Sequence, residues 1–155
     1  MKELLQKQKT TLISSVDAEN FPQASYAPFV IEEDKMYIYI SRIADHYRNL
    51  ENNGKVSVMV IEDECNSKIL FARKRISFSG MAKKVESVPE SVSKKFDENH
   101  PNMMGVLKTM DFDFFEIELA KGRLVEGFGK AFDLKYVNGE WVQEHVNLDG
   151  GHKNK

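Results

Sequence analysis

The chain has 155 residues, a length that suits a single domain with its own hydrophobic core. Its 22 Lys and Arg residues nearly balance 24 Asp and Glu residues, and the net charge of −2 argues against general nucleic-acid binding, which requires a basic face. No apolar run approaches the roughly 20 residues of a transmembrane helix, and the charged N-terminus does not resemble a secretory leader, so we expect a soluble, cytoplasmic protein without membrane insertion.

The first third of the sequence predicts three strands between two helices. In chain order these are a helix at 2–8, strands at 10–16, 24–31 and 36–40, and a helix that Asp45 caps and Gly54 ends. Pro28 lies inside the second of these strands. Because proline cannot donate a hydrogen bond to the ladder, we expect an edge position or a bulge there.

The rest of the sequence predicts more strands, two helices and a tail. In chain order these are a strand at 56–61 that is buried on both faces, a bent strand or two strands at 69–85, helices at 89–99 and 103–110, strands at 112–119 and 123–134, and a flexible tail at 142–155. Gly80 marks the bend in the long strand, and Gly127 and Gly129 interrupt the last one. These strands, with their short turns, predict a mainly β fold, an antiparallel barrel with peripheral helices, in one domain at 1–155.

Cations and hydroxyl groups alternate in the middle of the chain. In a strand, Arg73, Arg75, Ser77 and Ser79 share one face and Lys74 lies on the other. Guanidinium groups bind carboxylate or phosphate in a bidentate fork, so this face is a candidate anion site. A charged edge face that prevents aggregation explains the same pattern equally well.

Ser41 and Arg42 stand where the third predicted strand meets the second helix. Helix N-termini attract anions through free backbone N–H groups and the macrodipole, so Arg42 is a candidate for the same anion site. Ordinary helix capping beside a solvated face is the alternative, and without further information it is the favoured one.

Histidine and cysteine residues give no zinc pattern. His46, His100, His145 and His152 are scattered and match no metal-binding spacing, and the single cysteine, Cys65, allows no intrachain disulfide. His152 follows a Gly-Gly step near the C-terminus, a sequence that is usually a disordered tail. One imidazole is nevertheless sufficient as an axial haem ligand.

Four segments carry a family resemblance. They are the basic segment at 72–80, the aromatic segment at 110–115, the glycine-containing segment at 122–132 and the Gly-Gly-His segment at 150–153. Together they resemble the HugZ/HutZ family of bacterial haem-utilisation proteins and, more broadly, the pyridoxamine-phosphate-oxidase-like, FMN-binding split barrels. The resemblance implies a homodimeric, six-stranded antiparallel split barrel that binds haem (iron protoporphyrin IX) in place of FMN at the subunit interface.

The resemblance also implies roles for particular residues. His152 matches the tail histidine that ligates the haem iron, and is therefore the predicted metal ligand and catalytic residue. Arg73 and Arg75 match the basic strand near the acidic groups of the ligand, with Arg73 the first choice. The other predicted ligand-binding residues are Ser77, Lys74, Ser41 and Arg42.

These features predict a haem-binding protein that degrades haem oxidatively to release iron, with electrons from an unidentified donor. One alternative is an FMN-dependent oxidoreductase, in which Arg73, Arg75, Ser41 and Arg42 hold the phosphate. The other is a haem carrier or storage protein with the same site and no turnover. Haem is favoured over FMN because the flavin alternative gives His152 no role.

Overall fold

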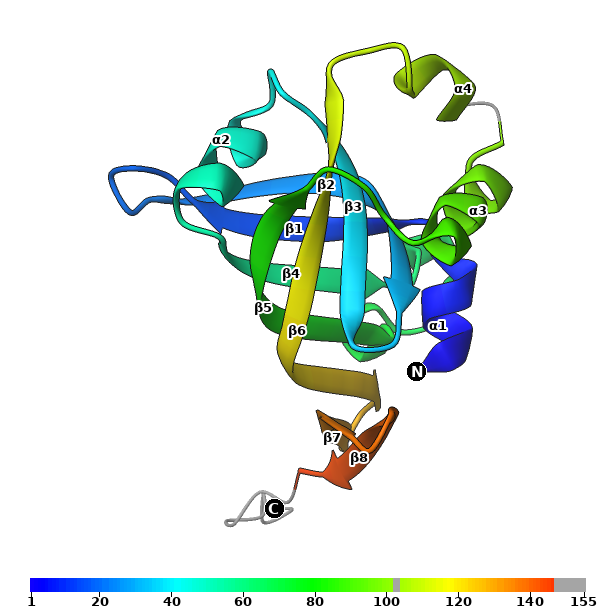
Figure 1. The fold of residues 1–155 in the computed structure, drawn as a ribbon. Helices are drawn as coiled ribbons and strands as arrows, with labels where there is room; N and C mark the ends of the chain where they lie inside the picture. Colours follow the sequence, from blue (N-terminus) through cyan, green and yellow to red (C-terminus); the bar gives the residue numbers. More distant parts are fainter. Residues whose placement is uncertain (102–103, 147–155) are drawn as a thin grey trace, which may run out of the picture.

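Eight strands form one antiparallel sheet within the residues that this computed structural model describes, 1–101 and 104–146 (Figure 1). The strands are β1 (Thr10–Val16), β2 (Pro22–Glu32), β3 (Lys35–Ser41), β4 (Lys55–Ile61), β5 (Arg75–Val85), β6 (Phe112–Gly127), β7 (Lys130–Val137) and β8 (Glu140–His145). The helices are α1 (Lys2–Lys7), α2 (Asp45–Asn52), α3 (Glu90–Asn99) and α4 (Met104–Leu107), with 3₁₀ turns η1 (Glu64–Asn66) and η2 (Leu70–Ala72). The expected mainly β class with peripheral helices is confirmed.

Six of the strands close into a barrel. Their order is β3-β2-β1-β4-β5-β6, and pairing between β3 and β6 completes the ring. Strands β7 and β8 continue the sheet from the far end of β6 and project away from the barrel (Figure 1). The predicted six-stranded antiparallel barrel is therefore confirmed, and the β7–β8 hairpin is an addition to it.

Two groups of apolar side chains stabilise this arrangement. The barrel interior is filled from all sides, for example by Ile38, Phe78 and Phe115, which are almost completely buried. A second group lies outside the barrel, where Val92 and Phe96 of α3 pack against β2, β3 and β6. The helices α3 and α4 therefore cover β3 and β6, whereas outward-facing side chains of β1, β4 and β5 remain largely exposed.

The longest strand differs from its prediction. Residues predicted as two separate strands, 112–119 and the start of 123–134, form the single 16-residue strand β6. A bulge in β6, opposite Ser79 and Gly80 of β5, bends β6, because Ser79 pairs with Lys121 while Gly80 pairs with Leu119. The bend lets one strand pair with β3 at one end and with β7 at the other.

Three local predictions are wrong for identifiable reasons. Strand β4 is not buried on both faces, since it alternates with Val58 inward and Ser57 outward. The predicted strand at 69–85 begins only at Arg75, because η2 precedes it. Helix α2 has Ala44 as its N-cap, while the Asp45 carboxylate accepts hydrogen bonds from side chains of α2 and β2.

The predicted tail at 142–155 begins too early. Asn138 and Gly139 both adopt positive φ angles, 50° and 87°, which form the tight turn that joins β7 to β8. Val142 consequently pairs with Lys135 within the sheet. An Asn-Gly pair between β-forming residues is a strong hairpin signal, and it predicts this turn. The rest of the predicted tail, 147–155, lies outside the described residues.

Candidate functional site

The basic strand presents a polar outer face. Arg75, Ser77 and Ser79 alternate along β5 with the buried side chains of Ile76 and Phe78. The predicted alternation is therefore confirmed from Arg75 onward. The Arg75 guanidinium donates to the carbonyl of the residue two positions before it at 3.2 Å, and no carboxylate within the described residues forms an ion pair with it.

Arg73 and Lys74 do not belong to this face. Both precede β5, and Arg73 ends the η2 turn. Its guanidinium donates to the carbonyl oxygen of Glu62 and pairs with the Glu64 carboxylate at 3.0 Å. Lys74 lines a separate hollow beneath α1. Arg73 thus braces the loop after β4, and Arg75 is the arginine whose charge is available on the outer face.

Ser41 and Arg42 lie at the opposite end of β6 from Arg75. Ser41 pairs with Phe112 at the start of β6, whereas Arg75 pairs with Val125 near its end. The 13 intervening steps along the strand span roughly 43 Å of chain, at about 3.3 Å per residue. The prediction that Arg42 joins the Arg75 face is therefore wrong within one chain, because the two groups occupy different ends of the barrel.

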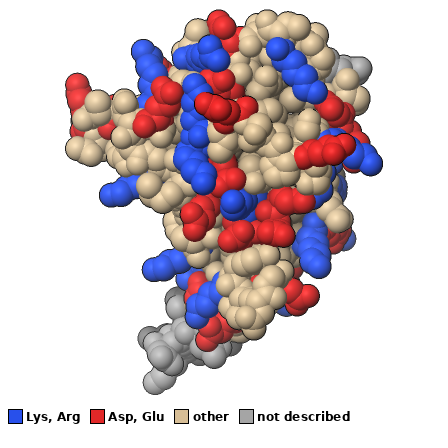
Figure 2. All heavy atoms as spheres, in the orientation of Figure 1, with Lys and Arg blue, Asp and Glu red and all other residues tan. Residues whose placement is uncertain are grey.

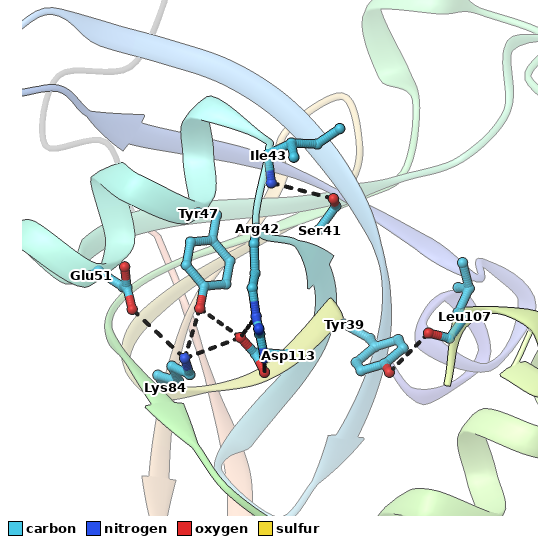
Figure 3. A network of polar contacts seen from close by, with 9 residues as sticks. All are labelled: Tyr39, Ser41, Arg42, Ile43, Tyr47, Glu51, Lys84, Leu107 and Asp113. Carbon is cyan, nitrogen blue, oxygen red and sulfur yellow. Dashed lines mark hydrogen bonds and ion pairs between the residues drawn. The ribbon is translucent and has the colours of Figure 1, made fainter. Parts of the chain in front are cut away.

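Arg42 instead belongs to a network around Asp113 (Figure 3). Its Nε and Nη2 donate to the two carboxylate oxygens of Asp113 at 2.8 and 2.9 Å. The Tyr47 hydroxyl donates to Asp113 Oδ2 at 2.6 Å, and the Lys84 ammonium lies 3.1 Å from the same oxygen. Lys84 also donates to the Tyr47 oxygen at 2.8 Å and lies 3.9 Å from Glu51. One carboxylate of β6 thus joins the residue after β3 to β5 and α2.

Charge in this network is strongly stabilised. Hydrogen bonds from Arg42, followed by those from Tyr47 and Lys84, hold the pKa of Asp113 well below its usual range. Burial, and then the hydrogen bond to this carboxylate, raise the pKa of Tyr47. These shifts widen the pH range over which Asp113 is anionic and Tyr47 is neutral.

The sequence carries a signal for this network that was missed. Asp113 stands at an inward register position of β6, between the aromatic residues Phe112 and Phe114 and in line with the buried Phe115. A carboxylate at a core-facing position requires cationic or hydrogen-bonding partners. Tyr47 and Lys84 could not be assigned to it from sequence, because they come from α2 and β5.

Replacing Asp113 by asparagine is expected to destabilise the fold by about 1–2 kcal/mol, since charge-assisted hydrogen bonds are lost while the cations keep access to water. The depressed pKa of Asp113 gives stability that is present above about pH 4 and is lost as the pH falls further. Urea unfolding should therefore show that the difference in free energy of unfolding between wild type and Asp113→Asn is smaller at pH 3 than at pH 7. Asp111→Asn, a change at an exposed neighbouring residue, is the control. An equal loss of stability in Asp111→Asn would contradict a specific role for the network around Asp113.

The histidines of the described residues form no metal site. Burial lowers the pKa of His46 and of His100, and His100 Nε2 is buried without a hydrogen-bond partner. Within residues 1–101 and 104–146, no group of three or more His, Cys, Asp or Glu side chains could hold a metal ion. The predicted ligand His152 lies outside the described residues. Near the end of the described residues, the Val146 amide donates a hydrogen bond to the Ala131 carbonyl at 2.9 Å.

Surface charge is mixed. Figure 2 shows acidic and basic side chains interspersed over the face drawn there, as expected for nearly equal numbers of the two. No helix among the described residues is both long and apolar enough to cross a membrane.

Comparisons with known proteins show which family and which relatives the chain is similar to. The family model for pyridoxamine 5'-phosphate oxidase matches residues 1–126. A Vibrio cholerae serotype O1 protein named haem oxygenase HutZ is 40% identical over 157 residues, which cover 99% of this chain and 88% of HutZ.

Solved structures agree with the sequence match. One is the crystal structure of HutZ from Vibrio cholerae, which is described there as the haem storage protein. It is 41% identical with a TM-score of 0.71, and the match takes in 76% of this chain and 86% of HutZ. ChuZ from Campylobacter jejuni is 28% identical with a TM-score of 0.84; the match takes in 99% of this chain but only 63% of ChuZ. The chain therefore spans less than two thirds of ChuZ.

Proposed function

The chain belongs to the pyridoxamine 5'-phosphate oxidase family, in the branch that contains HutZ, and we propose that it binds haem and degrades it oxidatively to release iron. The names of its relatives support haem as the ligand. They differ on turnover, since HutZ is called both a haem oxygenase and a haem storage protein. Both names therefore support haem binding, and only the name haem oxygenase supports haem degradation.

The proposal rests on how close the end of β8 lies to the start of β5 in the sheet. Val146 lies beside Ala131 of β7, Ala131 pairs with Val125 of β6, and Val125 pairs with Arg75 of β5. Three strand spacings amount to roughly 14 Å. The six residues from Val146 to His152 span up to roughly 20 Å when extended. The chain is thus long enough to carry His152 above the outer face of β5.

The residues near this face suit a flat ligand with acidic side groups. Arg75 provides a cation for a carboxylate, and Ile69, Leu70 and Phe71 expose 52, 59 and 87% of their surfaces just before β5. Exposed apolar side chains a few residues before an arginine with no ion-pair partner among the described residues suit a porphyrin ring with its propionates. His152, when neutral, would ligate the iron.

Haem itself supplies the oxygen chemistry when it is bound. The roles proposed for the chain are narrower. Arg75 would hold a propionate, the apolar turn around η2 would exclude water from the ligand, and His152 would bind the iron. Electrons come from a donor that remains to be identified, and a homodimer in the cytoplasm is the proposed setting.

The FMN alternative is weaker because its cations are engaged elsewhere. A phosphate at the β3–α2 junction would need Arg42, whose guanidinium already forms a bidentate pair with Asp113. Arg73 is likewise held by Glu62 and Glu64. Arg75, Ser77 and Ser79 stay available, and they lie beside the other end of β6.

The test uses the purified chain with haem and, separately, with FMN. We expect a Soret band to develop at a one-to-one ratio with haem, and to disappear when a reductant and oxygen are added, with free iron appearing in a chelator assay. A stable Soret band under reductant and oxygen would reject degradation and leave a carrier. Tight binding of FMN with no response to haem would reject the proposal altogether.

A further inference from the structure

A group of polar side chains lies next to Arg75 on the outer face of the barrel. Ser57 of β4 pairs with Ser79 of β5, and Ser79 pairs with Lys121 of β6, so the three stand in one row across the sheet. Ser77 lies two residues from Ser79 on the same face. These four residues, here called the serine–lysine cluster, line one surface hollow of about 330 Å³.

The cluster is unpaired. Within residues 1–101 and 104–146, no side-chain hydrogen bond or ion pair engages any of its four members. The neighbouring Arg123 differs, because it pairs with Asp133 at 2.8 Å across β6 and β7. Asp133 also lines the hollow, and its negative charge is already balanced by that pair. Lys121 is therefore the uncompensated charge of the hollow.

Three hydroxyls and one ammonium form a site for a carboxylate. Lysine supplies the charge, and each serine can donate one hydrogen bond to an oxygen. A solvated surface patch is the ordinary explanation of an exposed lysine. Here, however, the register places serines of two adjacent strands in one row with the lysine, and all line the same hollow. The nearest member, Ser77, is only about 7 Å along β5 from Arg75.

We propose that the serine–lysine cluster holds one propionate of the ligand while Arg75 holds the other, an inference that rests on the proposed function. The two carboxylates then fix the rotation of the ring in its plane, as two separated anchors fix an orientation that a single one leaves free. The cluster belongs to β4, β5 and β6, the rigid wall of the barrel, and so it is formed before the ligand arrives.

The decisive variant is Lys121→Ala, measured by titration with haem and with haem dimethyl ester, which lacks both propionate charges. For haem, we expect Kd to rise about tenfold or more, as for the loss of a charge-assisted hydrogen bond. For the ester, we expect the variant and wild type to agree. Lys94→Ala, an exposed lysine of α3, is the control and should match wild type with both ligands.

Two outcomes would overturn the inference. One is an unchanged haem Kd in Lys121→Ala; the other is an equal loss for haem and for the ester, which would indicate a general disturbance of the face. Ser57→Ala combined with Ser79→Ala should weaken haem binding in the same selective way. If wild type binds no haem at all, the proposed function itself is rejected. If wild type binds haem and Lys121→Ala binds it equally well, only the role of the serine–lysine cluster is rejected.

Discussion

Replacing His152 by alanine is expected to remove most of the Soret absorption of the haem-loaded protein. In the proposed site the His152 imidazole would supply the bond between the chain and the iron, whereas Arg75 and the serine–lysine cluster would hold only the propionates. Outer-shell partners of a metal typically contribute 10–100-fold to affinity, so loss of the ligand itself should cost at least about that much. Haem titration followed by absorption spectroscopy measures the change.

Two further variants make this result specific. His152→Gly should recover the Soret band when free imidazole is added, because the small molecule can occupy the place of the missing side chain. His145→Ala, in β8 beside Phe132, changes the other histidine near this end of the chain and should leave the spectrum intact. The ligand assignment is wrong if His152→Ala keeps the wild-type spectrum, or if His145→Ala is the variant that loses it.

Much of the barrel could be predicted because its strands alternate. The alternation of β5, with Ile76 and Phe78 buried and Ser77 and Ser79 on the other face, is visible in the sequence. The same logic failed at β4, whose apolar residues suggested two covered faces. Met59 of β4 is apolar and faces outward, and composition alone does not separate an exposed apolar side chain from a buried one.

The candidate site was harder to predict because it depends on register between distant strands. Alternation correctly grouped Arg75, Ser77 and Ser79, but it also included Arg73, which a short 3₁₀ turn removes from the strand. Lys121 could not be placed beside Ser79 from sequence, since that register depends on one bulge in β6. Local patterns fix which face a residue occupies, whereas long-range pairing decides its neighbours.

Replacing Gly80 by alanine is expected to lower the free energy of unfolding by about 3 kcal/mol, near the upper end for overpacking, because a backbone atom must move. A Cβ atom at this position would lie 2.4 Å from the carbonyl oxygen of Glu118 and 2.9 Å from the Ile117 side chain. Urea unfolding, or a fall in Tm of roughly 6–12 °C, measures the effect. Gly105→Ala is the control, since nothing lies within 4 Å of a Cβ there.

The position of Gly80 also links stability to ligand binding. It lies at the bulge where β6 shifts register, and that shift sets Lys121 opposite Ser79. An alanine that forces β6 away from β5 should therefore displace Lys121 from the serine–lysine cluster, and haem should bind more weakly even at temperatures where the variant is fully folded. The dimethyl ester again distinguishes the causes: its affinity should fall less than that of haem. A Gly80→Ala variant as stable as wild type would show that β6 can absorb the extra carbon, and the bulge would then not be the feature that holds the two strands in register.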